Sequence, residues 1–243
     1  LLVAVVVIIA WGDGASGSPD QRIAGDGFRW AIDLIVLGGT ALSLILLEAD
    51  HARSGAYSPE VPVLMLLAAS GMMVMAAARD LMFIFLGIEL MSIPVYVLVL
   101  LGYRRPESAE AALKYLVLSG TASASFLMGA SLMYGSTGSL ALESFALAIG
   151  SPRLLAGTAV VMVVSAFFLK AAIVPFHGWA PDAYEAASVP STAFMAVLVK
   201  VGVLVAAARV FGTAHVAEPL AGLLAILPLA SIAWGNVAAM RQT

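Results

Sequence analysis

Seven apolar runs divide this chain, and each is at least about as long as the 20 residues that an α-helix needs to cross a bilayer. Short stretches rich in glycine, proline, serine and charged residues separate them. The runs do not alternate apolar with polar residues as the strands of a membrane barrel do, and an open sheet edge cannot face lipid. We therefore expect an all-α, polytopic bundle of transmembrane helices. The expected helices cover residues 28–47, 59–78, 80–101, 109–134, 154–184, 191–211 and 219–240, preceded by a partial helix over 1–11.

The composition supports a membrane protein and excludes several classes of function. Hydrophobic residues make up 62% of the chain and charged residues 11%, and the mean hydropathy is +1.02. Soluble domains contain about 45–50% apolar and about 25% charged residues. The net charge is only -3 and the sequence has no basic face, so a nucleic-acid partner is not expected. The chain has no cysteine, which excludes a thiolate nucleophile and any cysteine-held iron–sulfur cluster or zinc.

The apolar run over residues 154–184 is too long for one simple crossing, and it contains Pro175. A proline inside a helix lacks the N–H donor, and its ring clashes with the carbonyl four residues earlier, here that of Ala171. We predict two half-helices with the break at Pro175. Such a break is tolerated in a membrane where protein or water satisfies the freed backbone groups, which makes it a candidate ion site. The alternative is a simple kink that neighbouring helices accommodate.

Glu89, Lys170 and Lys200 place charges near the middle of apolar runs. A charge at the centre of a membrane helix costs roughly 2.5 to 3.5 kcal/mol unless it is paired or meets water. A nearby carboxylate favours the protonated form of a lysine, whereas burial alone favours the neutral form. We therefore predict a proton relay in which Lys170 holds its proton while Glu89 is close and passes it to Lys200 when they separate. A static pair that only fixes helix packing is the alternative.

Two further titratable residues are candidates for this relay. Lys114 lies about one and a half turns inside its run, where a long side chain could instead reach the membrane interface. His177 directly follows the predicted break and can titrate near neutral pH, although a purely structural histidine is the alternative. Asp182 and Glu185 are expected to lie at the interface, since no nucleophile or metal-binding pattern accompanies them.

Other patterns predict packing and not chemistry. Ser119 and Ser123 have the four-residue spacing of small side chains that lets membrane helices approach closely. Asp80, at a tight junction between two apolar runs, is predicted to cap the second helix.

Long stretches around the central charges match a known pattern. They are RDLMFIFLGIELMSIPVYVL, SAEAALKYLVLSGTASASFLMGASLMYGSTGSL and FLKAAIVPFHGWAPDAYE. In these residues the chain resembles the antiporter-like membrane subunits of respiratory complex I. The first and third stretches are similar to all antiporter-like subunits, including those of cation/proton antiporter complexes and membrane-bound hydrogenases. The middle stretch most resembles the subunit N family of bacterial NADH:quinone oxidoreductases.

The resemblance implies a fold and an arrangement of the charges. Residues 59–211 would form one five-helix antiporter-like repeat with a proline-broken helix. Residues 1–58 would hold N-terminal helices, and 212–243 the first helix of a second, inverted repeat. Glu89 would pair with Lys170, both lysines would lie on a hydrated axis at mid-membrane, and Lys114 would tune that axis. Since family members continue into a full second repeat and this chain opens without an initiator methionine, we expect a fragment.

The resemblance also implies a function. The chain would be a multi-pass, proton-translocating subunit in the bacterial cell (inner) membrane, part of an NADH:quinone oxidoreductase but without a redox centre of its own. Its partners would be the other membrane subunits of complex I, and NADH, flavin, iron–sulfur clusters and quinone would be bound by partner chains. No catalytic residue, cofactor or metal is expected in this chain. The alternatives are a subunit of a multisubunit cation/proton antiporter or membrane-bound hydrogenase, and a structural scaffold whose charges only hold helices together.

Overall fold

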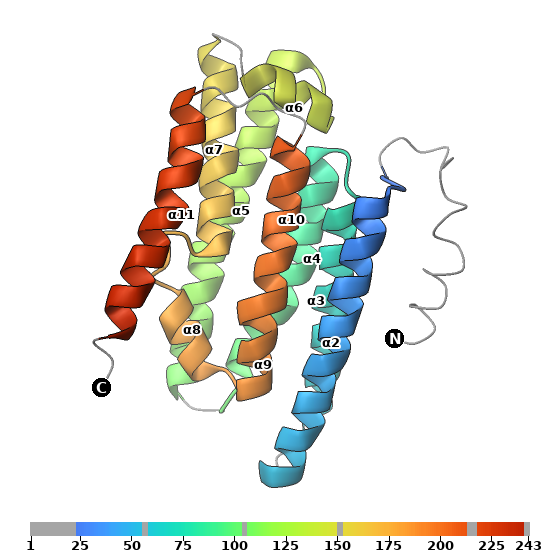
Figure 1. Cartoon of the computed structure of the whole chain (residues 1–243), viewed down its shortest axis with the longest axis vertical. Helices are drawn as coiled ribbons and strands as arrows, with labels where there is room; N and C mark the ends of the chain where they lie inside the picture. The colour runs from blue at the N-terminus through green and yellow to red at the C-terminus, as the bar shows by residue number, and fades with distance from the viewer. Residues whose placement is uncertain (1–22, 55–57, 104–105, 150–152, 213–217, 241–243) are drawn as a thin grey trace.

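The computed structural model describes residues 23–54, 58–103, 106–149, 153–212 and 218–240, and helices make up nearly all of this part (Figure 1). The long helices stand side by side in a bundle, with α2 and α11 on opposite sides of it (Figure 1). The elements are α2 (Gly27–Ser54), α3 (Glu60–Ala77), α4 (Leu81–Leu100), α5 (Pro106–Thr137), α6 (Leu142–Ile149), α7 (Leu154–Ala171), α8 (Ala180–Ala186), α9 (Val189–Phe194), η1 (Met195–Val199), α10 (Lys200–Phe211) and α11 (Glu218–Ala239).

Within these described ranges, six helical segments are long and apolar enough to cross a membrane. The expectation of an all-α transmembrane bundle is therefore confirmed. The helix expected over residues 219–240 is present as α11. The partial helix expected over residues 1–11 lies outside the described residues. The six segments are Gly27–Arg53, Glu60–Ala77, Leu81–Leu100, Pro106–Thr137, Leu154–Ala171 and Val189–Phe211.

Methionine side chains and a glycine lie in the interior between α3 and α4. Met72 and Met75 on α3 are fully buried. A Cβ atom on Gly71 would lie 2.5 Å from the backbone nitrogen of Met91, so α3 and α4 approach each other closely at this point. Glycine permits this approach because it has no side chain. The outward faces carry large apolar residues such as Ile45, as expected for helices in contact with lipid.

The long run over residues 154–184 forms two helices, as predicted, but the break begins earlier than Pro175. Helix α7 ends at Ala171, and Ala172 adopts the left-handed conformation with φ 56° and ψ 41°. The chain then runs without regular helix to Ala180, where α8 begins. A residue in the left-handed conformation commonly ends a helix. The helical conformation is also unfavourable for a residue that precedes a proline, as Val174 does. Figure 1 shows the gap between α7 and α8 at the middle of the bundle, next to α11.

The last complete crossing contains a π-helical turn that the sequence pattern did not predict. It runs through α9, the π-helix η1 and α10, so that Lys200 is the first residue after the π-turn. A π-turn widens the helix locally and is frequent at functional sites.

The junction between α3 and α4 is closed by backbone and side-chain hydrogen bonds. The Asp80 carboxylate accepts a bond of 2.8 Å from the backbone N–H of Phe83, which confirms the predicted cap. The backbone N–H of Leu81 donates a hydrogen bond of 2.9 Å to the carbonyl of Leu140. The backbone N–H of Leu142 donates one of 3.0 Å to the backbone carbonyl of Arg79. The segment between α5 and α6 is thereby fastened to the start of α4.

An arginine at the end of α10 ties three helices together. The Arg209 guanidinium donates two hydrogen bonds, of 2.6 and 2.7 Å, to the two carboxylate oxygens of Asp26, just before α2. Its Nε donates a third bond of 2.9 Å to the carbonyl of Ala76 in α3. The guanidinium carbon also lies 4.8 Å from the centre of the Phe28 ring. A bidentate arginine–carboxylate pair fixes orientation as well as distance.

We expect Asp26→Asn to destabilise the fold in a pH-dependent way. The hydrogen bonds from Arg209 lower the pKa of Asp26 from 3.8 to about 2. The ion pair is therefore fully stabilising above the unfolded-state pKa and is lost as the pH falls through about 2. Since Asp26 is partly exposed, the loss should be about 1 kcal/mol or less, or about 2–4 °C in Tm. Thermal unfolding in detergent should show a difference between variant and wild type at pH 6 that narrows towards pH 2, and a constant difference would contradict this role.

Candidate functional site

The most deeply buried ammonium group among the described residues belongs to Lys170, in the last turn of α7. Its Nζ lies 3.8 Å from Oε1 of Glu89 and donates hydrogen bonds to the hydroxyls of Ser92, over 2.9 Å, and Ser119, over 2.6 Å. The lysine side chain is 2% exposed and that of Glu89 is 29% exposed. A buried charge is tolerated when it is both paired and hydrogen-bonded, and these partners from α4 and α5 meet that requirement.

Two serines on α5 extend the pair into a hydrogen-bonded chain. The Ser123 hydroxyl donates to Oε1 of Glu89 and also lies 3.1 Å from the carbonyl of Ser119. The Ser119 hydroxyl accepts from Lys170 and from the Tyr96 hydroxyl, the latter over 2.7 Å. The sequence predicted packing alone for these serines, and that prediction was incomplete. Residues four apart share one face of a helix, and on α5 that face meets Glu89 and Lys170.

Lys200 binds the end of the broken helix. Its Nζ donates a hydrogen bond of 2.6 Å to the carbonyl of Ala171, the residue that follows Lys170 in the chain. The same Nζ lies 4.9 Å from the centre of the Trp179 ring, a distance at which an ammonium is attracted to the ring face. The structure thus brings the two lysines to the same end of α7.

Three aromatic rings in contact with one another form a wall that connects the surroundings of the two ammonium groups. Tyr96 meets Tyr115 edge to face, with centroids 4.9 Å apart, and Tyr115 stacks on Trp179 at 4.2 Å with an angle of 10° between the rings. The wall therefore extends from the hydroxyl that binds Ser119 to the ring that faces Lys200. Large rings beside polar groups exclude lipid and fix the geometry of the hydrogen bonds.

Side chains satisfy the backbone groups that the helix break exposes. Besides the Ala171 carbonyl, which accepts from Lys200, the Leu169 carbonyl accepts a bond of 3.0 Å from the Trp179 indole. The backbone N–H of Val174 donates a bond of 2.7 Å to the hydroxyl of Ser231 on α11. In a bilayer an unpaired backbone group costs several kcal/mol, so these bonds make the break tolerable.

His177 lies in the segment between α7 and α8 and is half-buried. Its Nδ1 atom is buried and has no hydrogen-bond partner in the part of the chain that the structure describes. Its ring contacts that of Trp234 on α11, with centroids 6.0 Å apart. The structure therefore brings His177 to the break, beside α11.

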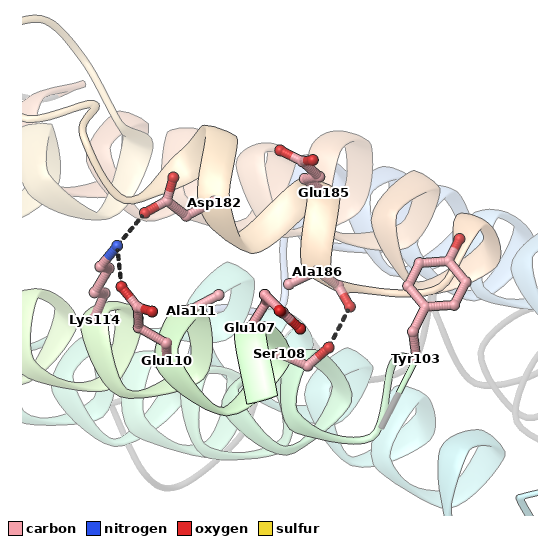
Figure 2. Close-up of a pocket in the computed structure, with 9 residues that line it drawn as sticks. All are labelled: Tyr103, Glu107, Ser108, Glu110, Ala111, Lys114, Asp182, Glu185 and Ala186. Atoms are coloured by element: carbon pink, nitrogen blue, oxygen red, sulfur yellow. Dashed lines mark hydrogen bonds and ion pairs between the residues drawn. The ribbon is translucent and has the colours of Figure 1, made fainter. Parts of the chain in front are cut away.

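Lys114 is not part of the Glu89–Lys170 cluster. Its Nζ lies 2.8 Å from both Oδ2 of Asp182 and Oε1 of Glu110, and its side chain is 48% exposed. Figure 2 shows these groups in a cleft of about 290 Å³ between α5 and α8, which Glu107 and Glu185 also line. The side chains of Asp182 and Glu185 are exposed, and their position at the membrane interface stays a prediction. The ion pair with Asp182 joins Lys114 to α8, the helix that follows the break.

Another buried carboxylate was missed by the sequence analysis. Asp33 on α2 is fully buried, and its Oδ2 lies 3.4 Å from Nε of Arg29, one turn earlier. The sequence could have revealed Asp33, because it is an acidic residue inside the apolar run over residues 28–47. The same feature identified Glu89.

Comparison with known proteins assigns the chain to a family. The family model described as NADH:quinone oxidoreductase/Mrp antiporter, transmembrane region, matches residues 78–243. The chain is 50% identical over 249 residues to NADH-quinone oxidoreductase subunit N of Gemmatimonas aurantiaca, covering 100% of this chain and 48% of the relative. The chain thus spans about half the length of the curated relatives it matches.

Solved structures have the same fold. A chain of respiratory complex I from Thermus thermophilus matches with a TM-score of 0.79 and 34% identity, over 99% of this chain and 51% of that one. A chain of the membrane-bound sulfane sulfur reductase, an archaeal respiratory membrane complex, matches with a TM-score of 0.82 and 25% identity, over 99% and 53%.

The helices and the relatives lead to the same assignment. Six described helices suit a bilayer, and the relatives of known name are bacterial membrane subunits, so the chain is a multi-pass protein of the bacterial inner membrane. The matched region includes Glu89, Lys170 and Lys200. This chain belongs to the family of NADH:quinone oxidoreductase and Mrp antiporter transmembrane proteins.

Proposed function

We propose that this chain is part of a proton-translocating membrane subunit of an NADH:quinone oxidoreductase, of the subunit N type. The observation that carries the proposal is the buried Lys170 ammonium, bound to Glu89 and two serine hydroxyls inside the bundle. A charge at this depth is expensive, and such groups in membrane proteins commonly mark proton or ion pathways. The identity to subunit N of Gemmatimonas aurantiaca supports the choice of complex.

In this proposal, Lys170 holds the proton and Glu89 controls it. While the carboxylate is close, its negative charge stabilises the protonated amine. When Glu89 moves away or gains a proton itself, the buried ammonium loses its counter-charge and releases its proton. The serine hydroxyls can donate and accept, so they can carry a proton between groups. Lys200, at the end of the same half-helix, is the acceptor, and His177 exchanges protons at the break.

The redox reaction belongs to other chains of the complex. This sequence has no cysteine, so any cysteine-bound iron–sulfur cluster must lie outside these 243 residues. NADH, flavin and quinone are likewise assigned to partner subunits, and the neighbours in the membrane are the other membrane subunits of the complex. Residues 59–211 form the first five-helix repeat and α11 begins the second. Lys114 tunes the relay from the cleft through its bond to Asp182.

We expect Lys170→Ala in the full-length protein to reduce proton pumping and coupled NADH:quinone electron transfer by at least about tenfold, because a positioned acid–base group contributes about 10²–10⁴-fold. Both rates are measured with the complex reconstituted in vesicles. Oxidation of NADH by an artificial electron acceptor should stay unchanged, which controls for assembly of the redox arm. Normal pumping in an assembled complex would refute the proposal.

Glu89→Gln separates a relay from a scaffold. Glutamine preserves the shape and can still accept from Ser123, but it cannot bind a proton or supply the counter-charge. The relay predicts that pumping falls several-fold while the complex remains assembled, whereas a scaffold predicts intact transport. Glu143→Gln on the exposed first turn of α6 is the matched control and should leave pumping unchanged.

A subunit of a cation/proton antiporter is the second candidate, because the matching family includes Mrp antiporters. The genes next to this one distinguish the two functions. Genes for flavin and iron–sulfur proteins favour the oxidoreductase, and genes for small membrane subunits alone favour the antiporter. A membrane-bound hydrogenase would instead be accompanied by genes for hydrogenase subunits.

A further inference from the structure

A serine on α11 is hydrogen-bonded to the broken segment. The Ser231 hydroxyl accepts a hydrogen bond of 2.7 Å from the backbone N–H of Val174, and it donates one of 2.9 Å to the carbonyl of Leu227 in its own helix. Val174 lies between α7 and α8, where its N–H has no place in a helical ladder. A hydroxyl that accepts one bond and donates another has its position fixed from both sides.

Trp234 on α11 contacts the same segment. Its ring lies 6.0 Å from that of His177, and the two rings are inclined by 67°. Residues three apart lie on one face of a helix, so Ser231 and Trp234 present a single face of α11 to the break. Figure 1 shows α11 running alongside the gap between α7 and α8.

Packing elsewhere along α11 is less close. An apolar cavity of about 150 Å³ lies between α7, α10 and α11, and Pro228 and Ile173 are among the residues that line it. A cavity lacks the dispersion contacts that would otherwise hold the helix in register. The hydrogen bond from Val174 to Ser231 is therefore important for the position of the break relative to α11.

We propose that Ser231 is a positioning residue for the relay. Ser231 accepts a hydrogen bond from the Val174 N–H and so fixes the segment that follows α7. The carbonyl of Ala171, at the end of α7, in turn binds the ammonium of Lys200. Between these two points the N–H of Ile173 donates a bond of 2.9 Å to the carbonyl of Phe168, so a shift at Val174 is transmitted to the end of α7. This inference rests on the proposed function, since it gives Ser231 an effect on proton transfer through Lys200.

The position of Ser231 connects the two repeats of the proposed protein. Ser231 lies on the helix that we assign to the second repeat, and Val174 lies in the broken helix of the first. A movement of α11 that lengthens this hydrogen bond would free the Val174 N–H and allow the Ala171 carbonyl to shift away from Lys200. Through this contact, the hydrogen bond between Lys200 and the Ala171 carbonyl depends on the position of α11.

The test uses the full-length protein in its complex and compares Ser231→Ala with Ser231→Thr, which retains the hydroxyl. Hydrogen exchange of the peptide that contains Val174 is measured by mass spectrometry, and proton pumping is measured in vesicles. We expect roughly tenfold faster exchange in S231A, the change that loss of one hydrogen bond produces. Pumping should fall about two- to tenfold, in keeping with loss of one hydrogen bond. S231T should restore both values.

Ser165→Ala is the matched control, because the Ser165 hydroxyl bonds the carbonyl of Val161 in its own helix. It should change neither the exchange nor the pumping. If S231A prevents assembly, Ser231→Cys, whose sulfur is a weaker acceptor, should give intermediate values.

Unchanged exchange at Val174 in S231A would overturn the inference. Faster exchange with normal pumping would also overturn it, because the serine would then hold the segment without affecting the relay. These results are separate from the test of the proposed function: if Lys170→Ala pumps normally, the relay fails whatever the exchange at Val174 shows.

Discussion

The requirement that backbone polar groups be satisfied inside a bilayer determines the structure around the broken helix. Termination of α7 at Ala171 exposes groups that a continuous helix would have paired. The Leu169 carbonyl accepts from Trp179, the Ala171 carbonyl accepts from Lys200, and the Val174 N–H donates to Ser231. Side chains from α10, from α11 and from the segment just before α8 thus converge on the break, and their positions follow from this requirement.

The same break explains why two lysines are found at one end of α7. The C-terminal end of a helix carries a partial negative charge, which favours a cation nearby. Lys170 lies in the last turn of α7, and Lys200 binds the carbonyl of the final residue of that helix. Glu89 and the hydroxyls of Ser92 and Ser119 supply the remaining partners of Lys170. The partial negative charge at the end of α7 and the carboxylate of Glu89 together stabilise ammonium groups in the apolar interior.

The sequence predicted the helices and the central charges because both stand out against apolar runs. Pro175 predicted a break but not its position, since the left-handed conformation of Ala172 depends on tertiary contacts and on no local signal. Ser119 was predicted to serve packing because its spacing from Ser123 is typical of close helix contacts, and its bond to Lys170, 51 positions away, leaves no local signal. The pairing of Arg209 with Asp26 joins residues 183 positions apart, which no local pattern reveals.

The hydrogen bonds around Lys170 can rearrange, which a fixed structural pair would not need. Glu89 lies 3.8 Å from the ammonium and also accepts from Ser123, so its carboxylate is shared between the two. Its side chain is 29% exposed, whereas that of Lys170 is 2% exposed, so Glu89 is the member of the pair that can reach the surroundings. Each hydroxyl in the chain can reverse its donor and acceptor roles when a proton moves. In the relay that we propose, the more exposed carboxylate controls the charge of the buried amine, and this asymmetry favours a relay over a scaffold.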